Sequence, residues 1–115
     1  MRVEADEVEE DEGVVFHQGV PFTGEVVESR PDGTVLTLYT YLNGVEDGPY
    51  REWFDRERPY KEGEMRYGVP VGRHRRWHAD GRLAADLLFG EGGDQLERRE
   101  WDERGNLVTE WVKQR

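Results

Sequence analysis

The sequence predicts an all-β fold, an elongated antiparallel meander of β-hairpins that forms a single twisted open sheet. Three observations support this prediction. Residue types recur at intervals of 24 in a chain of 115 residues. Apolar side chains alternate with a period of two between the recurring positions, as strands require. Turn-forming sequences, several of them built on the 14 glycines, separate the alternating segments.

The repeat interval is held by several columns of identical residues. A Trp column is preceded two positions earlier by an Arg column, and glycines recur at further positions. Such a period predicts an array of stacked repeats that share one core. The columns are Trp53, Trp77 and Trp101; Arg51, Arg75 and Arg99; Gly24, Gly48 and Gly72; Gly44, Gly68 and Gly92; and Gly81 and Gly105, with Gly33 two periods before Gly81.

The columns divide the chain into a half repeat at 13–23 and repeats at 24–47, 48–71, 72–95 and 96–115. Each repeat contains two extended segments joined by a turn, with turn sequences at 30–34, 79–82 and 103–106. The second repeat has Glu57 in place of the glycine, and Pro59 follows. We therefore expect a different or longer turn there.

The second segment of each repeat shows the clearest alternation. Leu83, Ala85, Leu87 and Phe89 share one face of an extended chain, and a similar set starts at Val35 in the first repeat. No segment sustains the 3.6-residue period of an amphipathic helix. These patterns indicate strands throughout the repeats.

Residues 1–12 form an acidic block with seven carboxylates and one arginine. A block of like charge with few apolar residues predicts a mobile, solvated tail. A second interpretation is an acidic arm that binds a basic partner. Its candidate contacts are Glu7, Glu9, Glu10 and Asp11.

The composition limits the classes of function. Formal net charge is −10, which disfavours binding to nucleic acids and to anionic lipid surfaces and suits a basic protein partner. There is no Cys, which excludes disulfides and thiolate metal sites. The acidic N-terminus lacks the basic region of a signal peptide, and no apolar run is long enough to span a membrane. We expect a cytoplasmic protein.

The Trp and Arg columns lie two positions apart on the same strands, so both are expected on one face of the sheet. One interpretation is packing between repeats, with the Arg stems lying over the Trp rings. The other is an Arg and aromatic groove that binds a partner, because these residues dominate interface energies. The candidate contacts are Arg51, Trp53, Arg75, Trp77, Arg99 and Trp101.

Other chemistry has weaker support in the sequence. The basic cluster at 73–76 is expected to pair with the chain's own acids, although it could bind a phosphate or an acidic partner. His74 and His78 would stand about 13 Å apart on a strand, too far for one metal ion. We expect no enzymatic activity, no metal site and no cofactor.

The repeat unit G-x4-W-x3-G-x-L, followed by an aromatic strand and a second glycine pair, resembles a variant MORN repeat. The unit is carried by Gly72, Trp77, Gly81, Leu83, Phe89 and Gly92, and in the preceding repeat by Gly48, Trp53, Met65 and Gly68. The resemblance covers roughly 13–112. It departs from the pattern at Glu57 and Leu96, where glycines would be expected.

Small bacterial proteins made only of such repeats resemble the YwqK-like antitoxin group and the immunity proteins of polymorphic toxin systems. That resemblance implies a non-catalytic protein-binding module that neutralises a cognate toxin. The alternative is a structural or scaffolding repeat protein that self-associates or tethers a partner. The identity of the partner and the oligomeric state stay open at this stage.

Overall fold

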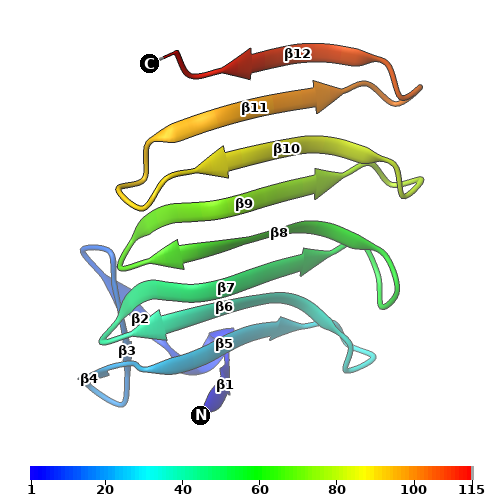
Figure 1. The fold of residues 1–115 in the computed structure, drawn as a ribbon. Helices are drawn as coiled ribbons and strands as arrows, with labels where there is room; N and C mark the ends of the chain where they lie inside the picture. The colour runs from blue at the N-terminus through cyan, green and yellow to red at the C-terminus, as the bar shows by residue number, and fades with distance from the viewer. Residues whose placement is uncertain (115) are drawn as a thin grey trace.

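A computed structural model describes residues 1–114 of the chain. A nine-stranded sheet in the order β1-β5-β6-β7-β8-β9-β10-β11-β12 forms the body of the molecule, and a three-stranded sheet, β2-β3-β4, lies at one end of it (Figure 1). The extents are 46 × 39 × 20 Å, those of a thin slab. The predicted all-β open meander is confirmed.

The strands from β5 onward follow one another along the chain, and each pairs antiparallel with the next. The predicted repeat boundaries at 48, 72 and 96 fall inside strands, so the structural unit is a hairpin shifted by a few residues from the glycine-based repeat. The bounds are β5 Gly24–Ser29, β6 Val35–Leu42, β7 Val45–Trp53, β8 Pro59–Arg66, β9 Val69–Trp77, β10 Leu83–Phe89, β11 Gln95–Trp101 and β12 Leu107–Val112.

The N-terminal block differs from the predicted tail. It contains β1 (Arg2–Glu4), the 3-10 helix η1 (Ala5–Glu7) and β2 (Glu9–Asp11), and β1 pairs in parallel with β5. Val3 lies opposite Val26 and is 4% exposed. Burial of Val3, with Val8 packed against the same cluster, ties the acidic block to the fold despite its charge.

The predicted half repeat does not begin the main sheet. It supplies β3 (Val14–His17) and β4 (Val20–Pro21), which form the small sheet together with β2. Val15 and Phe22 are buried against Val3 and Val26 of the main sheet. Their apolar side chains explain why this hairpin lies across one face of the main sheet and does not extend its edge.

The small sheet is also joined to the main sheet through the β6–β7 turn. The N–H of Val15 donates to the carbonyl of Gly44 at 2.9 Å, and the N–H of Gly44 donates to the carbonyl of Phe22 at 2.7 Å. A side chain at position 44 would overlap Val15, since its Cβ would lie 2.8 Å from the Val15 carbonyl oxygen. Glycine is therefore required here both for the turn and for this close approach.

Two kinds of turn alternate along the meander. The two-residue turns at 43–44 and 67–68 have positive φ at both positions, 49° and 83° in the first and 47° and 85° in the second. This is the type I′ pattern that fits the twist of a hairpin. The third turn of this series is longer, because β10 ends at Phe89 and β11 begins at Gln95. Gly93 has the positive φ of 88° there, so Gly92 is not equivalent to Gly44 and Gly68 as the period predicted.

The other turns span five residues each, at 30–34, 54–58, 78–82 and 102–106. The turn of the second repeat was predicted to be different or longer, and it has the same length as the others. Its hydrogen bonds do differ, because the N–H of Glu57 donates to the Asp55 carboxylate at 3.1 Å, whereas the glycine at the same place in each of the other three turns donates to a backbone carbonyl. A side chain thus replaces a backbone acceptor in the turn that lacks the glycine.

The register of the strands defines the two faces of the main sheet. Tyr39, Tyr50 and His74 lie on one side, which we call the aromatic face and which the small sheet partly covers. Arg51 and Arg75 lie on the opposite side, which we call the ion-pair face. No helix among residues 1–114 is long and apolar enough to cross a membrane.

Candidate functional site

A row of rings crosses the centre of the aromatic face. Tyr39 and Tyr50 stack with centroids 5.3 Å apart and an interplanar angle of 6°. His74 lies 5.5 Å from Tyr50 and 5.0 Å from Phe89, which meets it edge-on. These side chains come from β6, β7, β9 and β10, so the row joins residues that are far apart in the chain.

His74 is the buried polar residue at the centre of this row. Its Nε2 lies 3.0 Å from the carbonyl oxygen of Glu64 and 3.2 Å from that of Val71. Because carbonyls only accept, Nε2 carries a proton, and in the neutral imidazole Nδ1 is then the acceptor. The hydroxyl of Tyr50, 2.7 Å away, therefore donates to Nδ1. Both ring nitrogens have partners within the fold.

Gly63 makes this hydrogen bond possible. It lies on β8 between Tyr50 and His74, and a Cβ at this position would lie 2.7 Å from Cε2 of Tyr50 and would also overlap the imidazole. The two rings therefore meet across a strand that has no side chain between them. Burial is the main cause that raises the pKa of Tyr50 to about 12, with Glu52, Glu46 and Glu62 adding to it. The phenol is uncharged at neutral pH.

Three adjoining pockets follow the aromatic face, and we call them together the aromatic groove. A pocket of about 190 Å³ lies over Tyr50, His74 and Phe89, and one of about 290 Å³ shares Tyr50, His74 and Lys61 with it. The third, about 360 Å³, shares Glu46 with the second and reaches the small sheet. The groove has an aromatic floor and a few polar groups at its rim, a combination typical of binding sites.

The charges along the groove are unevenly placed. Glu46 and Glu10 lie at the end next to the small sheet, and burial, followed by repulsion from Glu10, raises the pKa of Glu46. Lys61 lies further along, with its ammonium 5.9 Å from the centroid of Tyr50. Arg76 lines the far pocket, and its guanidinium is 3.9 Å from the Glu100 carboxylate. The groove is thus acidic at one end and basic at the other.

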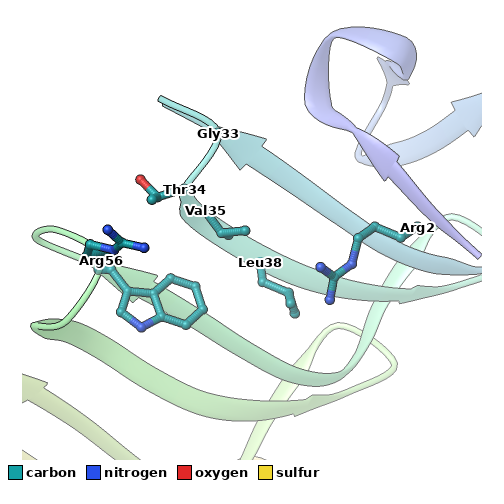
Figure 2. Close-up of a pocket in the computed structure, with 7 residues that line it drawn as sticks. Arg2, Gly33, Thr34, Val35, Leu38 and Arg56 are labelled. Atoms are coloured by element: carbon teal, nitrogen blue, oxygen red, sulfur yellow. The ribbon is translucent and has the colours of Figure 1, made fainter. Parts of the chain in front are cut away.

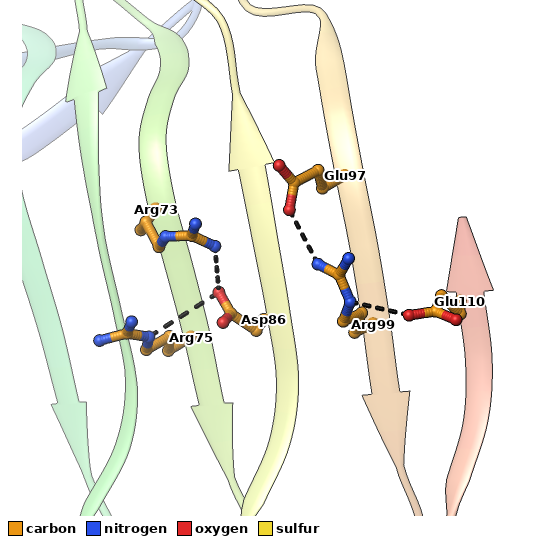
Figure 3. Close-up of polar contacts among 6 residues, drawn as sticks. All are labelled: Arg73, Arg75, Asp86, Glu97, Arg99 and Glu110. Atoms are coloured by element: carbon orange, nitrogen blue, oxygen red, sulfur yellow. Dashed lines mark hydrogen bonds and ion pairs between the residues drawn. The ribbon is translucent and has the colours of Figure 1, made fainter. Parts of the chain in front are cut away.

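The ion-pair face carries the predicted Arg column in a different setting. Arg99 is held by Glu97 at 2.8 Å and Glu110 at 3.0 Å, and Asp86 lies 3.2 Å from Arg73 and 3.8 Å from Arg75 (Figure 3). The register places Asp86 opposite both Arg75 and Arg99. The Nε of Arg75 is buried without a hydrogen bond, because 3.8 Å is ion-pair distance only.

The acidic partners of these arginines form a column of their own. Glu62, Asp86 and Glu110 recur at the same interval as the Arg column. They lie on the intervening strands, and Glu62 is 4.0 Å from Arg51 at the start of the row. The sequence-based prediction did not include this column, although its period was available as a signal. The predicted self-pairing of the basic cluster agrees with the contacts of Arg73 and Arg75.

The Trp column is half-buried and also pairs within the sheet. Trp53, Trp77 and Trp101 lie opposite Pro59, Leu83 and Leu107, which recur at the interval of the Trp column itself.

Trp53 also lines a pocket of about 420 Å³ on the ion-pair face, between Arg2 and Arg56 (Figure 2). The Arg30 guanidinium donates to the carbonyls of Trp53 and Val35, two residues of this lining, each at 2.9 Å. Trp53 therefore borders a cavity while it also pairs within the sheet.

The acidic residues proposed as partner contacts are divided between two positions. The Glu7 carboxylate accepts the backbone N–H of Glu4 at 3.1 Å and so takes part in the fold. Glu9, Glu10 and Asp11 lie exposed on β2, and Glu10 also lines the end of the aromatic groove. The acidic block is thereby placed beside the groove.

Within residues 1–114, no cluster of three or more His, Asp or Glu side chains is arranged to hold a metal ion. His74 uses both nitrogens in the contacts above, and Nε2 of His78 lies 2.9 Å from the carbonyl oxygen of Trp101.

Comparison with known proteins gives no assignment. No family model matches the chain, and neither a curated protein nor a solved structure matches it. The resemblance to variant MORN repeats and to antitoxins therefore stays a prediction from the sequence.

Proposed function

We propose that the protein is a non-catalytic binding module that holds an extended segment of a partner protein in the aromatic groove. The observation that carries this proposal is the continuity of three pockets over one aromatic floor. Tyr side chains supply large contact area at low entropic cost, because few torsions must be fixed on binding.

Two further features support the aromatic face as the binding surface. The hydrogen bonds of His74 and the stacking of Tyr39 on Tyr50 fix the floor before a partner arrives, which lowers the cost of binding. On the opposite face, the Arg side chains already have carboxylate partners. A partner there would have to replace existing ion pairs, so its gain would be smaller.

The more specific proposal is that the partner is a basic toxin and that binding neutralises it. The acidic block on β2 supports this, because carboxylates at the end of the groove would accelerate association with a positively charged protein. The variant MORN resemblance supports the same class of partner.

The test begins with a pull-down from the native host, followed by affinity measurements on the recovered partner. The groove variant is Lys61→Ala with Glu46→Gln, which removes two charged groups that line the middle pocket. The matched control is Arg51→Ala with Glu62→Ala on the ion-pair face. We expect the groove variant to weaken binding about tenfold and the control to change it less than about twofold. The reverse order of effects would refute the groove as the binding surface.

The toxin proposal has a separate readout. A recovered basic protein whose toxicity is suppressed by co-expression of this chain would support it. Substitution of Glu9, Glu10 and Asp11 by the corresponding amides is then expected to slow association at low salt and to have little effect at high salt. A partner that is not toxic would refute neutralisation while leaving the groove proposal in place.

A further inference from the structure

Within residues 1–114, the outer edge of β12, the last strand of the main sheet, pairs with no other strand and carries exposed apolar side chains. Leu107, Val108, Trp111 and Val112 are 49%, 61%, 44% and 45% exposed. β12 is short and carries a bulge, and both features blunt an edge, but four large apolar residues are exposed on it where natural edge strands normally carry charge.

Comparison with the earlier repeats shows that the edge of β12 lacks a following strand. In every repeat the second strand has a bulge one residue after it begins, at Leu36, Tyr60, Ala84 and Val108. In the first three repeats, another hairpin follows this second strand. Ala84, at the bulge of the third repeat, is only 1% exposed, whereas Val108, at the bulge of the last repeat, is 61% exposed. In the earlier repeats, a following strand pairs with the edge that β12 leaves open.

The opposite end of the sheet cannot supply that strand. Its edge is occupied by β1, which is short and runs parallel to β5, and the small sheet packs beside it. A head-to-tail array of copies would therefore have to pair β12, which has 6 residues, with the 3-residue strand β1, whereas a second β12 offers a partner of equal length. Pairing between two β12 edges is closed by a two-fold axis, which limits the assembly to two copies.

The hydrogen-bonding groups of β12 fit such a pairing. The N–H of Lys113 donates to the carbonyl of Leu96 at 2.9 Å, so this residue faces β11. By alternation, Trp111 and Thr109 also face β11, while Val112 and Glu110 direct their backbone groups to the open edge. These groups can bond an antiparallel strand of a second copy.

Charge favours this end of the molecule for self-association. Residues 96–114 contain five acidic and four basic residues, although the whole chain carries −10. Two copies that meet at β12 therefore bring together nearly neutral regions and hold the acidic N-terminal blocks far apart. A register that placed Glu110 opposite Glu110 of the second copy would bring two like charges together. The register centred on Thr109 avoids this contact and places Leu107 opposite Trp111 of the second copy.

We propose that β12 pairs antiparallel with β12 of a second copy of the chain, joining the two main sheets into one continuous sheet about a two-fold axis at Thr109. The interface is small, so the dimer forms at about micromolar concentrations. This inference stands on the exposed edge and does not depend on the groove.

The first test is the mass of the wild-type chain by sedimentation and light scattering over a range of concentrations. The expected mass rises from 13.5 kDa to twice that value. Val108→Lys and Trp111→Lys are expected to raise the dissociation constant at least about tenfold, because both place charge at the edge. Val20→Lys, at a position 63% exposed on β4, is the matched control and is expected to dimerise normally.

The second test uses the absence of native cysteine. Thr109 faces itself as a non-hydrogen-bonded pair, where Cα atoms are about 4.5 Å apart and a disulfide can form. Oxidised Thr109→Cys is expected to yield a covalent dimer, and Val20→Cys is expected to stay without a crosslink. A Trp111→Cys dimer without a Thr109→Cys dimer would support the paired edge with the two-fold axis moved to residue 111, which shifts the register by four residues. Wild-type protein that is monomeric at all concentrations, with no crosslink at either position, would overturn the proposal.

Discussion

The two ends of the main sheet are built differently although the same hairpin lies between them. At the β5 end, β1 and the small sheet cover the first hairpin and bury Val3, Val15 and Phe22. At the β12 end, no element within residues 1–114 covers the last hairpin, and Val108 and Trp111 remain exposed. The difference teaches that a repeat does not bury its own apolar residues. It depends on whatever is stacked next to it.

The largest expected effect comes from placing the same charge at each end. Val3→Asp buries a carboxylate without a partner and is expected to lower the free energy of unfolding by about 3–5 kcal/mol. Val108→Asp is expected to change the stability of the monomer by less than about 0.5 kcal/mol, because the side chain is 61% exposed. Urea unfolding of both variants at low protein concentration measures the contrast. Equal losses would contradict the difference between the two ends.

The second effect concerns Gly63, which lies on β8 between the two ends of the main sheet. Gly63→Ala is expected to destabilise by about 1–3 kcal/mol, because the added methyl overlaps the rings of Tyr50 and His74. Gly92→Ala, in the loop near the open end, is the control, since its Cβ has only the Asp94 carboxylate within 4.0 Å. Thermal unfolding of the two variants compares a crowded glycine with an unconstrained one. A stable Gly63→Ala protein would mean that the rings do not meet across β8.

The third effect isolates one hydrogen bond. Tyr50→Phe leaves Nδ1 of His74 buried without a donor and is expected to cost about 1–3 kcal/mol. Tyr67→Phe, at a position 60% exposed, should be neutral. Chemical denaturation gives the two values. The same loss in both variants would show that the hydroxyl of Tyr50 contributes nothing specific.

The smallest effect is a pH-dependent gain in stability from a substitution of Glu46, near the end of the sheet that the small sheet covers. The pKa of Glu46 is raised in the folded state, so its ionised form is disfavoured there, and stability is lost as pH rises through the raised pKa. Glu46→Gln should therefore raise the melting temperature at pH 7, and the gain should vanish below about pH 4, where glutamates are protonated in both states. Glu103→Gln, in the exposed turn near the other end, is the control. A gain that persists at low pH would exclude ionisation as its cause.

The main sheet was predictable because its determinants are local and repeated. The Trp and glycine columns, the alternation and the turn sequences fix each hairpin with information from neighbouring residues. The aromatic groove was not predicted, because Tyr39, Tyr50 and His74 meet only once the register of several strands is known. The predicted Arg and Trp surface has contacts mainly within the sheet, and the acidic column that explains the Arg contacts has the same period and was overlooked.

The N-terminal block was mispredicted for a different reason. Charge composition describes the average behaviour of a segment, whereas this one is anchored by two valines and by the pairing of β1 with β5 and of β2 with β3. The first of them, Val3, finds its partner far along the chain at Val26, and no local pattern reports such a pairing.

That parallel pairing also bears on the order in which the chain folds. Hairpins from β5 to β12 close short loops and can form one after another, each using the previous strand as a template. The β1–β5 pairing must close a much longer loop, whose entropic cost is repaid only after β5 is in place. The first residues of the chain therefore reach their final position only after β5 has formed, and during synthesis they wait for a strand that has not yet been made.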